Sequence, residues 1–280
     1  MTDMSNLTES MWRVLITPSA RGAWNMAVDE AILEAVGRSE SIPTLRLYSW
    51  QPPCLSLGYA QPYADADASR LAACGWDLVR RPTGGRAILH TDELTYSVIG
   101  LQNEPRLKGD LLESYHRLSG ALLAALHLLG LPALAQSLSP QIQDGHSKGP
   151  VCFEVPSNYE ITVDGKKLIG SAQARRHASV LQHGSLPLWG DLRRITQALC
   201  YDNEQEREEA AARLLTRATT VETVLGYRIE WDTAAQAMAA AFEKELTLKL
   251  QPANLTPTEV QRAEELVREK YGNKEWTERI

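Results

Sequence analysis

The hydrophobic pattern of the chain alternates between helical spacing and strand-like alternation. Apolar residues recurring every three to four positions predict helices, whereas strict alternation of apolar and polar residues predicts half-buried strands. The predicted helices cover residues 23–36, 67–74, 110–129, 191–199, 204–215, 219–225, 232–246 and 256–271. The predicted strands cover residues 12–16, 44–50, 54–58, 77–81, 87–90, 94–99, 159–163 and 180–188, with one more starting at residue 166.

Turn and cap residues fix several boundaries. Capping boxes, in which Thr is followed three residues later by Glu, predict helix starts at Thr219 and Thr256. Asp164-Gly165 predicts a two-residue hairpin, because this turn requires positive φ. The return strand then carries Lys167 close to the loop before the first strand. Cys152 lies in that loop, so the two side chains can meet although fourteen residues separate them.

A cysteine beside an ammonium group is a suitable nucleophile for acyl transfer. The thiol attacks as its thiolate, and a nearby positive charge lowers its pKa by stabilising the anion. The Lys167 ammonium can also polarise the carbonyl oxygen of a thioester under attack. The alternative is that Cys152 is a small buried apolar residue, the commoner role of a free cysteine, and that Lys167 is simply solvated. Spacing alone leaves both interpretations open.

Residues 82–86, Pro-Thr-Gly-Gly-Arg, form a second candidate site between two predicted strands. Paired glycines let backbone N–H groups approach a ligand closely, and the arginines at positions 80, 81 and 86 favour an anion. The alternative is a hairpin turn with solvated arginines, since Gly-Gly is a common hairpin connection. The signatures GxGxxG and GxxxxGK[ST] are absent from this loop, which therefore supports neither a Rossmann site nor a P-loop.

Composition narrows the function classes. The 280 residues are 44% hydrophobic, enough for one large core or two modest ones. The net charge of −6 gives no reason to expect nucleic acid, and no apolar run is long enough to span a bilayer. The four cysteines lie far apart, so a disulfide framework or zinc ribbon is not predicted. The N-terminus lacks a signal-peptide pattern, so we expect a reducing cytoplasm.

The imidazole and acidic side chains suggest neither a metal site nor an acid–base pair. His177 and His183 flank a predicted turn and are candidates for pairing, but two histidines without nearby carboxylates make a poor zinc site. His90 follows the glycine loop and is a candidate for the same pocket. Asp29, Asp92 and Asp144 offer no catalytic pair that the sequence can justify.

Two long motifs carry a family resemblance. Residues 80–90 read Arg-Arg-Pro-Thr-Gly-Gly-Arg-Ala-Ile-Leu-His, and residues 165–173 read Gly-Lys-Lys-Leu-Ile-Gly-Ser-Ala-Gln. In this order they resemble the lipoate–protein ligase and octanoyltransferase family. The resemblance implies an α+β fold of the biotin/lipoate ligase type, with a largely antiparallel central sheet flanked by helices. We expect a catalytic domain over residues 1–250 and a C-terminal helical extension, residues 251–280, packed on the same domain.

Residues 152–159, Cys-Phe-Glu-Val-Pro-Ser-Asn-Tyr, resemble the LipM-type octanoyltransferases, whose nucleophilic cysteine lies in such a segment. This implies that Cys152 and Lys167 are catalytic and that no cofactor is needed. An octanoyl group would arrive as a thioester on acyl carrier protein, form an acyl-enzyme on Cys152, and pass to the lysine of a lipoyl domain, typically the glycine-cleavage H protein. The acyl-binding residues implied are Arg81, Gly84, Gly85, Arg86, Ala87, Ile88, Leu89, His90, Gly170, Ser171 and Ala172. Candidates for docking the acidic protein substrates are Lys148, Lys166, Arg175 and Arg176.

Three other functions stay open. An ATP-dependent lipoate–protein ligase shares the lysine motif and would use Lys167 to hold the phosphate of a lipoyl-adenylate, with Cys152 as a bystander. An amidotransferase would move octanoyl groups between lipoyl domains, also through a cysteine. A non-catalytic binder of acylated carrier proteins is the third alternative, which the presence of both reactive residues disfavours.

Overall fold

The computed structural model describes residues 7–137 and 159–280. Eight strands form the main sheet, in the order β11-β1-β2-β6-β10-β9-β8-β7. Their bounds are β1 Ser10–Ile16, β2 Thr44–Tyr48, β6 Glu93–Leu101, β7 Leu134–Ser137, β8 Tyr159–Val163, β9 Lys166–Arg176, β10 Ser179–Pro187 and β11 Leu248–Pro252. The pairs β11–β1 and β1–β2 are parallel, and the other five described pairs are antiparallel. The expected α+β fold with a largely antiparallel sheet is therefore confirmed.

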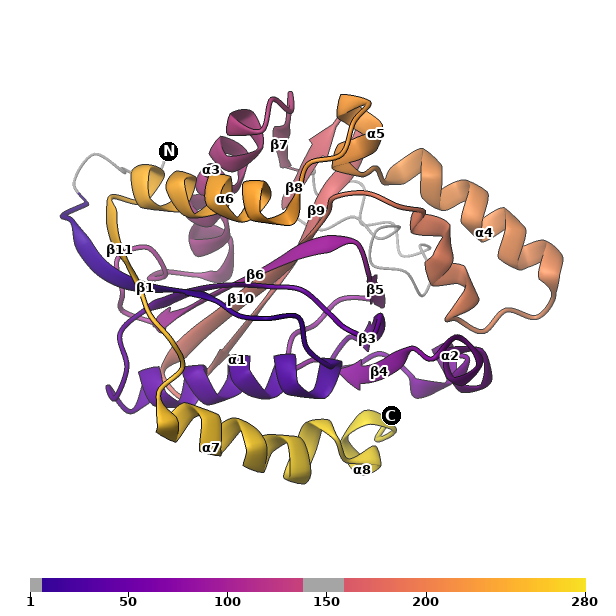
Figure 1. The fold of residues 1–280 in the computed structure, drawn as a ribbon, viewed down its shortest axis with the longest axis horizontal. Coiled ribbons are helices and arrows are strands. Elements are labelled where there is room, and N and C mark those ends of the chain that lie inside the picture. Colours follow the sequence, from indigo (N-terminus) through magenta and orange to yellow (C-terminus); the bar gives the residue numbers. More distant parts are fainter. Residues whose placement is uncertain (1–6, 138–158) are drawn as a thin grey trace.

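Helices cover both faces of this sheet (Figure 1). On one face, α3 Leu111–Leu128 packs against α6 Trp231–Glu245. On the other, α1 Gly22–Gly37 packs against α7 Pro257–Leu266. Each face has its own apolar core, and α1 is buried on nearly all sides because it lies between the sheet and α7. The molecule therefore has three layers, with the sheet in the middle.

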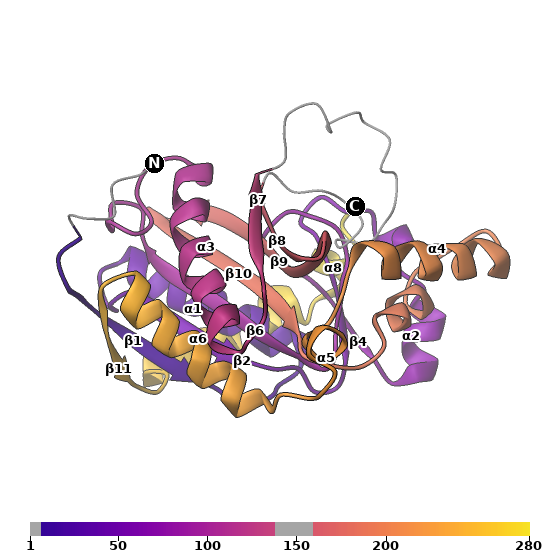
Figure 2. The same cartoon turned by 90° about the horizontal axis from the view of Figure 1, so that it is seen from above.

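Further helices complete the chain. Their bounds are α2 Ala68–Cys74, α4 Glu204–Arg217, α5 Val221–Leu225 and α8 Lys274–Thr277. Both views place α4 at the end of the molecule that carries α2 (Figure 1, Figure 2), and an ion pair between Arg70 and Glu204 joins the two helices. In the part of the chain that the structure describes, no helix has the length and apolar character needed to cross a bilayer.

Most predicted helix boundaries hold, but two details differ. The capping box at Thr256 is confirmed, whereas the cap of α5 is Thr220, whose side chain accepts from the Thr223 amide. Thr219 is displaced from that role because its amide donates to the Lys167 carbonyl at 3.1 Å, which ties it to the edge of β9. The predicted helix over residues 191–199 is a 3₁₀ helix over Leu192–Gln197.

A separate three-stranded sheet carries the glycine loop. Its middle strand, β3 Cys54–Leu57, pairs in parallel with β4 Asp77–Arg80 and antiparallel with β5 Ile88–His90. Because β4 and β5 lie on opposite sides of β3, the glycine loop crosses the end of β3, and the hairpin interpretation of Gly84-Gly85 is wrong. The Asp164-Gly165 hairpin is confirmed, with φ of 50° and 74° between β8 and β9.

The C-terminal segment returns along α1. Strand β11 continues to Pro252 beside β1, so it runs across the expected boundary at residue 250. After α7 comes a π-helical turn, Val267–Tyr271, which also packs on α1. α8 then contacts β4, the strand that leads into the glycine loop.

Candidate functional site

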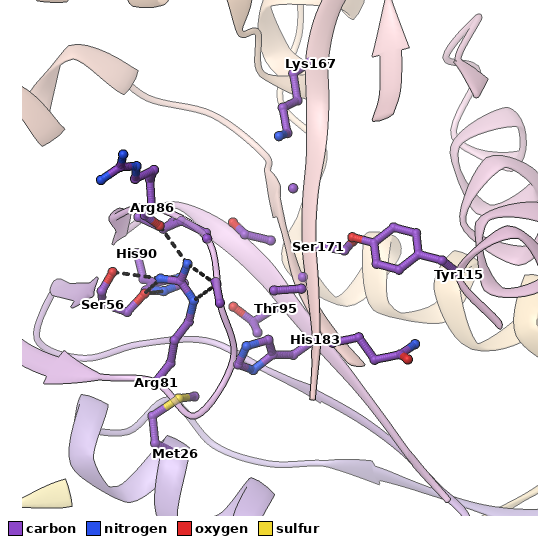
Figure 3. Close-up of a pocket in the computed structure, with 18 of the residues that line it drawn as sticks. Met26, Ser56, Arg81, Arg86, His90, Thr95, Tyr115, Lys167, Ser171 and His183 are labelled. Atoms are coloured by element: carbon purple, nitrogen blue, oxygen red, sulfur yellow. Dashed lines mark hydrogen bonds between the residues drawn. The ribbon is translucent and has the colours of Figure 1, made fainter. Parts of the chain in front are cut away.

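A cavity of about 390 Å³ lies between the glycine loop and strand β9 (Figure 3). Ten of the predicted site residues line it: Arg81, Gly84, Gly85, Arg86, Ile88, His90, Lys167, Gly170, Ser171 and Ala172. The two motifs that are distant in the sequence therefore meet on opposite walls of one cavity. Apolar side chains from α1, β2 and α3 supply much of the remaining lining.

Ala87 and Leu89 do not line this cavity. Ala87 is fully buried in an apolar cluster with Leu55 and Leu57, and Leu89 packs against the same cluster. Successive side chains of a strand point to opposite faces, so Ile88 and His90 face the cavity while Leu89 faces away. The structure thus places these two predicted acyl-binding residues in the supporting core.

Arg81 holds the glycine loop in shape. Its guanidinium donates to the Gly84 carbonyl at 2.8 Å and to the Arg86 carbonyl at 2.7 Å. It also donates to the Ser56 carbonyl at 3.0 Å, which ties the loop to β3. Charge-assisted hydrogen bonds of this kind are stronger than neutral ones, so the loop is well fixed. Arg81 therefore orders the backbone of the cavity wall.

His90 belongs to a polar network at the cavity floor. Its Nδ1 lies 2.7 Å from Oε1 of Glu93, and its Nε2 lies 2.8 Å from Oγ of Ser56. The ring stacks on Trp50, with centroids 3.9 Å apart and planes 12° from parallel. Burial alone would raise the pKa of Glu93, but His90 and the hydroxyl groups that contact it hold the pKa below its ordinary value. A buried carboxylate whose pKa is lowered thus lies against the imidazole of His90.

A second buried network centres on Asp29 of α1. Its carboxylate accepts from Arg46 at 2.7 Å, from the Tyr48 hydroxyl at 2.9 Å and from Ser97 at 3.0 Å. Its Oδ2 also lies 3.6 Å from Nδ1 of His183, which lines the cavity. Burial alone would raise the pKa of Asp29, but Arg46 and His183 together hold it below its ordinary value.

These contacts correct two expectations about the imidazole and acidic side chains. A carboxylate does lie beside His183, although the sequence offers none nearby. His177 does not pair with His183, because it sits in the β9–β10 turn while His183 lies opposite Ala172 in the sheet register. The antiparallel β9–β10 pairing, once known, would have assigned His183 to the wall that carries Ala172.

Lys167 reaches the cavity from the start of β9. It is 3% exposed, and its side chain leaves the strand on the side that faces Arg86 (Figure 3). A bridge to Ala218 and the hydrogen bond from the Thr219 amide fix its backbone. Because this buried cationic side chain lines the cavity, it is a candidate to contact a molecule bound there. Cys152, its predicted partner, lies outside the described residues.

The predicted docking arginines have contacts inside the protein. Arg175 donates to the carbonyls of Gly109 and Asp110 at 2.7 and 3.0 Å, which fixes the backbone before α3. Arg176 lies over the Tyr59 ring at 5.0 Å. Lys166 is partly exposed, and Lys148 lies outside the described residues. Arg175 is therefore better explained as a support for the helix that lines the cavity than as a free docking charge.

Several lining residues were not predicted from the sequence. They are Met26, Tyr48, Trp50, Ser56, Thr95, Leu111, Leu112, Tyr115, Gln173, His183, Gly184 and Ser185. Most look like ordinary core or strand positions, because only the tertiary arrangement brings them to the cavity. Leu111 and Leu112 differ from ordinary core residues in the structure, because both are more than 40% exposed at the start of a strongly apolar helix.

The fold and the site together define a class of protein. The fold, a mixed sheet between two helical layers, is shared with solved lipoate–protein ligases. The bi-partite lipoate protein ligase of Thermoplasma acidophilum superposes with a TM-score of 0.78 at 24% identity, over 97% of both chains. A lipoate-protein ligase A bound with ATP superposes at 0.76 with 25% identity, over 97% of this chain and 99% of that one.

The sequence comparison is more specific. Residues 21–243 match the lipoyl protein ligase A/B catalytic domain, and the chain belongs to that family. It is 41% identical to the octanoyltransferase LipM of Symbiobacterium thermophilum, over 97% of this chain and 99% of that protein. It is 38% identical to the octanoyltransferase LipM of Kyrpidia tusciae, over 96% and 98% of the two chains. The family resemblance inferred from the two motifs is confirmed.

Proposed function

We propose that this protein is an octanoyltransferase of lipoate biosynthesis that works through a thioester on Cys152. Similarity to LipM octanoyltransferases over nearly the whole chain supports the reaction. The observation that carries the mechanism is the burial of Lys167 at the wall of a largely apolar cavity. An apolar cavity suits an alkyl chain, and a buried lysine at its wall suits an anion that forms beside it.

In the proposed first step the Cys152 thiolate attacks the carbonyl carbon of an octanoyl thioester on acyl carrier protein. Lys167 stabilises the thiolate and then the oxyanion of the tetrahedral intermediate. The C–S bond to the carrier breaks, and the carrier thiol leaves after taking up a proton. The enzyme then holds the octanoyl group as a thioester on Cys152.

In the second step the acceptor is the amine of a lipoyl-domain lysine, such as that of the glycine-cleavage H protein. The neutral amine attacks the acyl-enzyme, the C–S bond to Cys152 breaks, and the amine loses a proton as an amide forms. Conversion of a thioester to an amide is downhill, so no ATP and no cofactor enter the proposal. The reaction would take place in the cytoplasm, where thiols stay reduced.

The walls of the cavity would hold the acyl chain. Gly84 and Gly85 leave space on the loop side, and Gly170 and Ala172 leave space on the strand side. We propose that these residues, with Arg81, Arg86, Ile88, His90 and Ser171, make up the acyl-binding site. We also propose that residues 1–250 act as the catalytic domain, with residues 251–280 as an extension packed on it.

Intact-protein mass spectrometry tests the proposal. The protein is mixed with octanoyl acyl carrier protein without ATP, and a gain of one octanoyl group that maps to Cys152 is expected. Adding a lipoyl-domain acceptor should then move the group to that acceptor. Modification of the acceptor only when free octanoate and ATP are supplied would favour the ligase instead. Transfer from an octanoylated lipoyl domain, but not from the carrier, would favour the amidotransferase.

A further inference from the structure

The last residues of the chain lie directly behind the glycine loop. Arg80 is fully buried, and its guanidinium donates twice to the Thr277 carbonyl, from Nε at 3.0 Å and from Nη2 at 2.8 Å. In return, Nε1 of Trp276 donates to the Arg80 carbonyl at 2.9 Å. Three hydrogen bonds thus join α8 to the last residue of β4, immediately before the loop begins.

The same arginine holds the chain that follows β3. Its Nη1 donates to the Gly58 carbonyl at 2.9 Å and to the Gln61 carbonyl at 2.5 Å. Arg279 adds a hydrogen bond to the Tyr59 carbonyl at 2.6 Å. The backbone of residues 58–61 is therefore held by hydrogen bonds from Arg80 and from Arg279 near the C-terminus.

That segment lies against the other side of the glycine loop. A Cβ placed on Gly58 would lie 1.9 Å from the Gly85 carbonyl oxygen, so the two backbones are in direct contact. The Tyr59 amide donates to the Thr83 carbonyl at 2.8 Å. Gly85 in turn lines the cavity with φ of 91°. An unbroken series of contacts thus runs from Thr277 through Arg80 and Gly58 to the cavity wall.

Arg80 and Arg81 support the glycine loop from two different sides. Successive side chains of an extended chain point to opposite sides, so Arg81 faces the loop while Arg80 faces the C-terminus. Arg81 fixes the loop carbonyls from within, as described above. Arg80 fixes the backing segment and links it to α8. The loop is therefore held from both sides, and the outer support depends on residues beyond the family match, which ends at residue 243.

We propose that residues 276–280 are a positioning element for the acyl-binding loop and act on it through Arg80 and the Gly58–Tyr59 backbone. This inference rests on the proposed function for its kinetic test, because the loop is the proposed wall for the octanoyl chain. It assigns the C-terminus a role in substrate affinity in addition to its packing on α1.

The test uses three variants, of which the first two both loosen the C-terminal segment. Trp276→Phe keeps an aromatic ring but removes the hydrogen bond to the Arg80 carbonyl. Arg262→Met removes the ion pair that ties α7 to Glu34 of α1, at 2.8 Å; the other ion-pair partners of Arg262 are Glu265 and Glu269, which follow it along the chain. Arg80→Lys is a third variant, which keeps the charge but loses the planar fork that reaches several carbonyls.

The first readout is the steady-state kinetics of octanoyl transfer from octanoyl acyl carrier protein, well below the melting temperature. Losing one partly buried hydrogen bond is expected to raise the KM of Trp276→Phe about threefold to tenfold, with a smaller change in kcat. Arg80→Lys should raise KM at least as much. Arg262→Met should lower the melting temperature and leave KM unchanged.

The second readout does not depend on activity. Hydrogen exchange at the amides of Gly84, Gly85 and Arg86 should be faster in Trp276→Phe than in Arg262→Met at equal stability. Equal exchange and equal KM in these two variants would overturn the inference and leave the C-terminus with a packing role only. Octanoyl transfer by the wild-type protein is measured first, and its absence would refute the proposed function. The comparison of hydrogen exchange between the two variants needs no activity, so it would still decide this inference.

Discussion

Nδ1 of His183, which lines the cavity, lies 3.6 Å from Oδ2 of the fully buried Asp29. On its other side, Nε2 of the same ring lies 2.7 Å from Oγ1 of Thr83, the residue before the two loop glycines. With its proton on Nδ1 facing the carboxylate, a neutral His183 accepts the Thr83 hydroxyl at Nε2. The buried carboxylate thus sets the orientation of a ring that anchors the start of the loop.

This arrangement predicts a dependence of stability on pH. Burial lowers the pKa of His183 and outweighs the opposite effect of Asp29. In the window between this lowered pKa and the unfolded value of about 6.5, the unfolded chain binds a proton that the native protein does not. Stability should therefore be fully present above about pH 6.5 and fall as the pH drops below it, by at most ~1.4 kcal/mol per pH unit for this one group.

His183→Gln should remove that part of the slope, while His116→Gln serves as the control because His116 is exposed on α3. The measurement is urea unfolding of wild type and both variants between pH 5 and 7.5. A wild-type slope in His183→Gln, or a slope lost equally in the control, would show that His183 does not titrate as described.

Most helices and strands could be predicted from the sequence because their signals are local, whereas the short elements β7, β11 and α8 were not predicted. The apolar stripe of residues 110–129 and the Asp164-Gly165 turn need no knowledge of the rest of the chain. The position of Asp29 beside His183 depends instead on the order of β2, β6 and β10 in the sheet, which no local pattern reports. The hairpin interpretation of the glycine loop was wrong for the same reason, because β3 lies between β4 and β5, the two strands that flank the loop.

The residues of the candidate site likewise fall into those that the sequence could identify and those that required the structure. Lys167 and the loop glycines were found because they lie in long motifs. Arg80 lies in the same motif as Arg81, yet its partner Thr277 is at the far end of the chain, so its role could not be read from the sequence. His90 was a candidate from the sequence, whereas Trp50 was not, and the stacking of the two rings is apparent only from the structure.

The two loop glycines should differ in their tolerance of substitution. Gly85 has φ of 91°, where a side chain costs about 1–2 kcal/mol, whereas a Cβ on Gly84 would meet no atom within 4 Å. Gly85→Ala should therefore lower the free energy of unfolding by about that amount and raise the KM for octanoyl acyl carrier protein. Gly84→Ala is the matched control and should stay within ~0.5 kcal/mol of wild type. Equal losses in both variants would contradict a specific backbone requirement at Gly85.

Cys152→Ser should abolish transfer from octanoyl acyl carrier protein. An alcohol is far less acidic than a thiol, so Lys167 cannot ionise it, and no acyl-enzyme should form. Mass spectrometry of the variant after mixing with the donor checks the loss of the adduct, and a thermal melt checks that the nearly isosteric change leaves the fold intact. Transfer at the wild-type rate would rule out the cysteine mechanism and favour the ATP-dependent ligase.

The coupling between Cys152 and Lys167 can be measured through the pKa of the thiol. An adjacent ammonium should hold that pKa below the ordinary value of about 8.5, so Lys167→Met should raise it toward that value or beyond. The readout is the pH dependence of iodoacetamide alkylation. Cys74 and Cys200 are exposed and must first be changed to Ala, whereas burial raises the pKa of Cys54 so far that it can stay in place.

Lys167→Arg provides the comparison that separates charge from geometry. A guanidinium keeps the positive charge but spreads it over a planar fork, so this variant should restore only part of the lowered thiol pKa. An alkylation profile between those of wild type and Lys167→Met would therefore support a direct charge effect on Cys152. Identical profiles for all three proteins would mean that the two side chains do not meet. Lys167 would then be better explained as a ligand for an adenylate phosphate, which is the role that the ATP-dependent ligase requires.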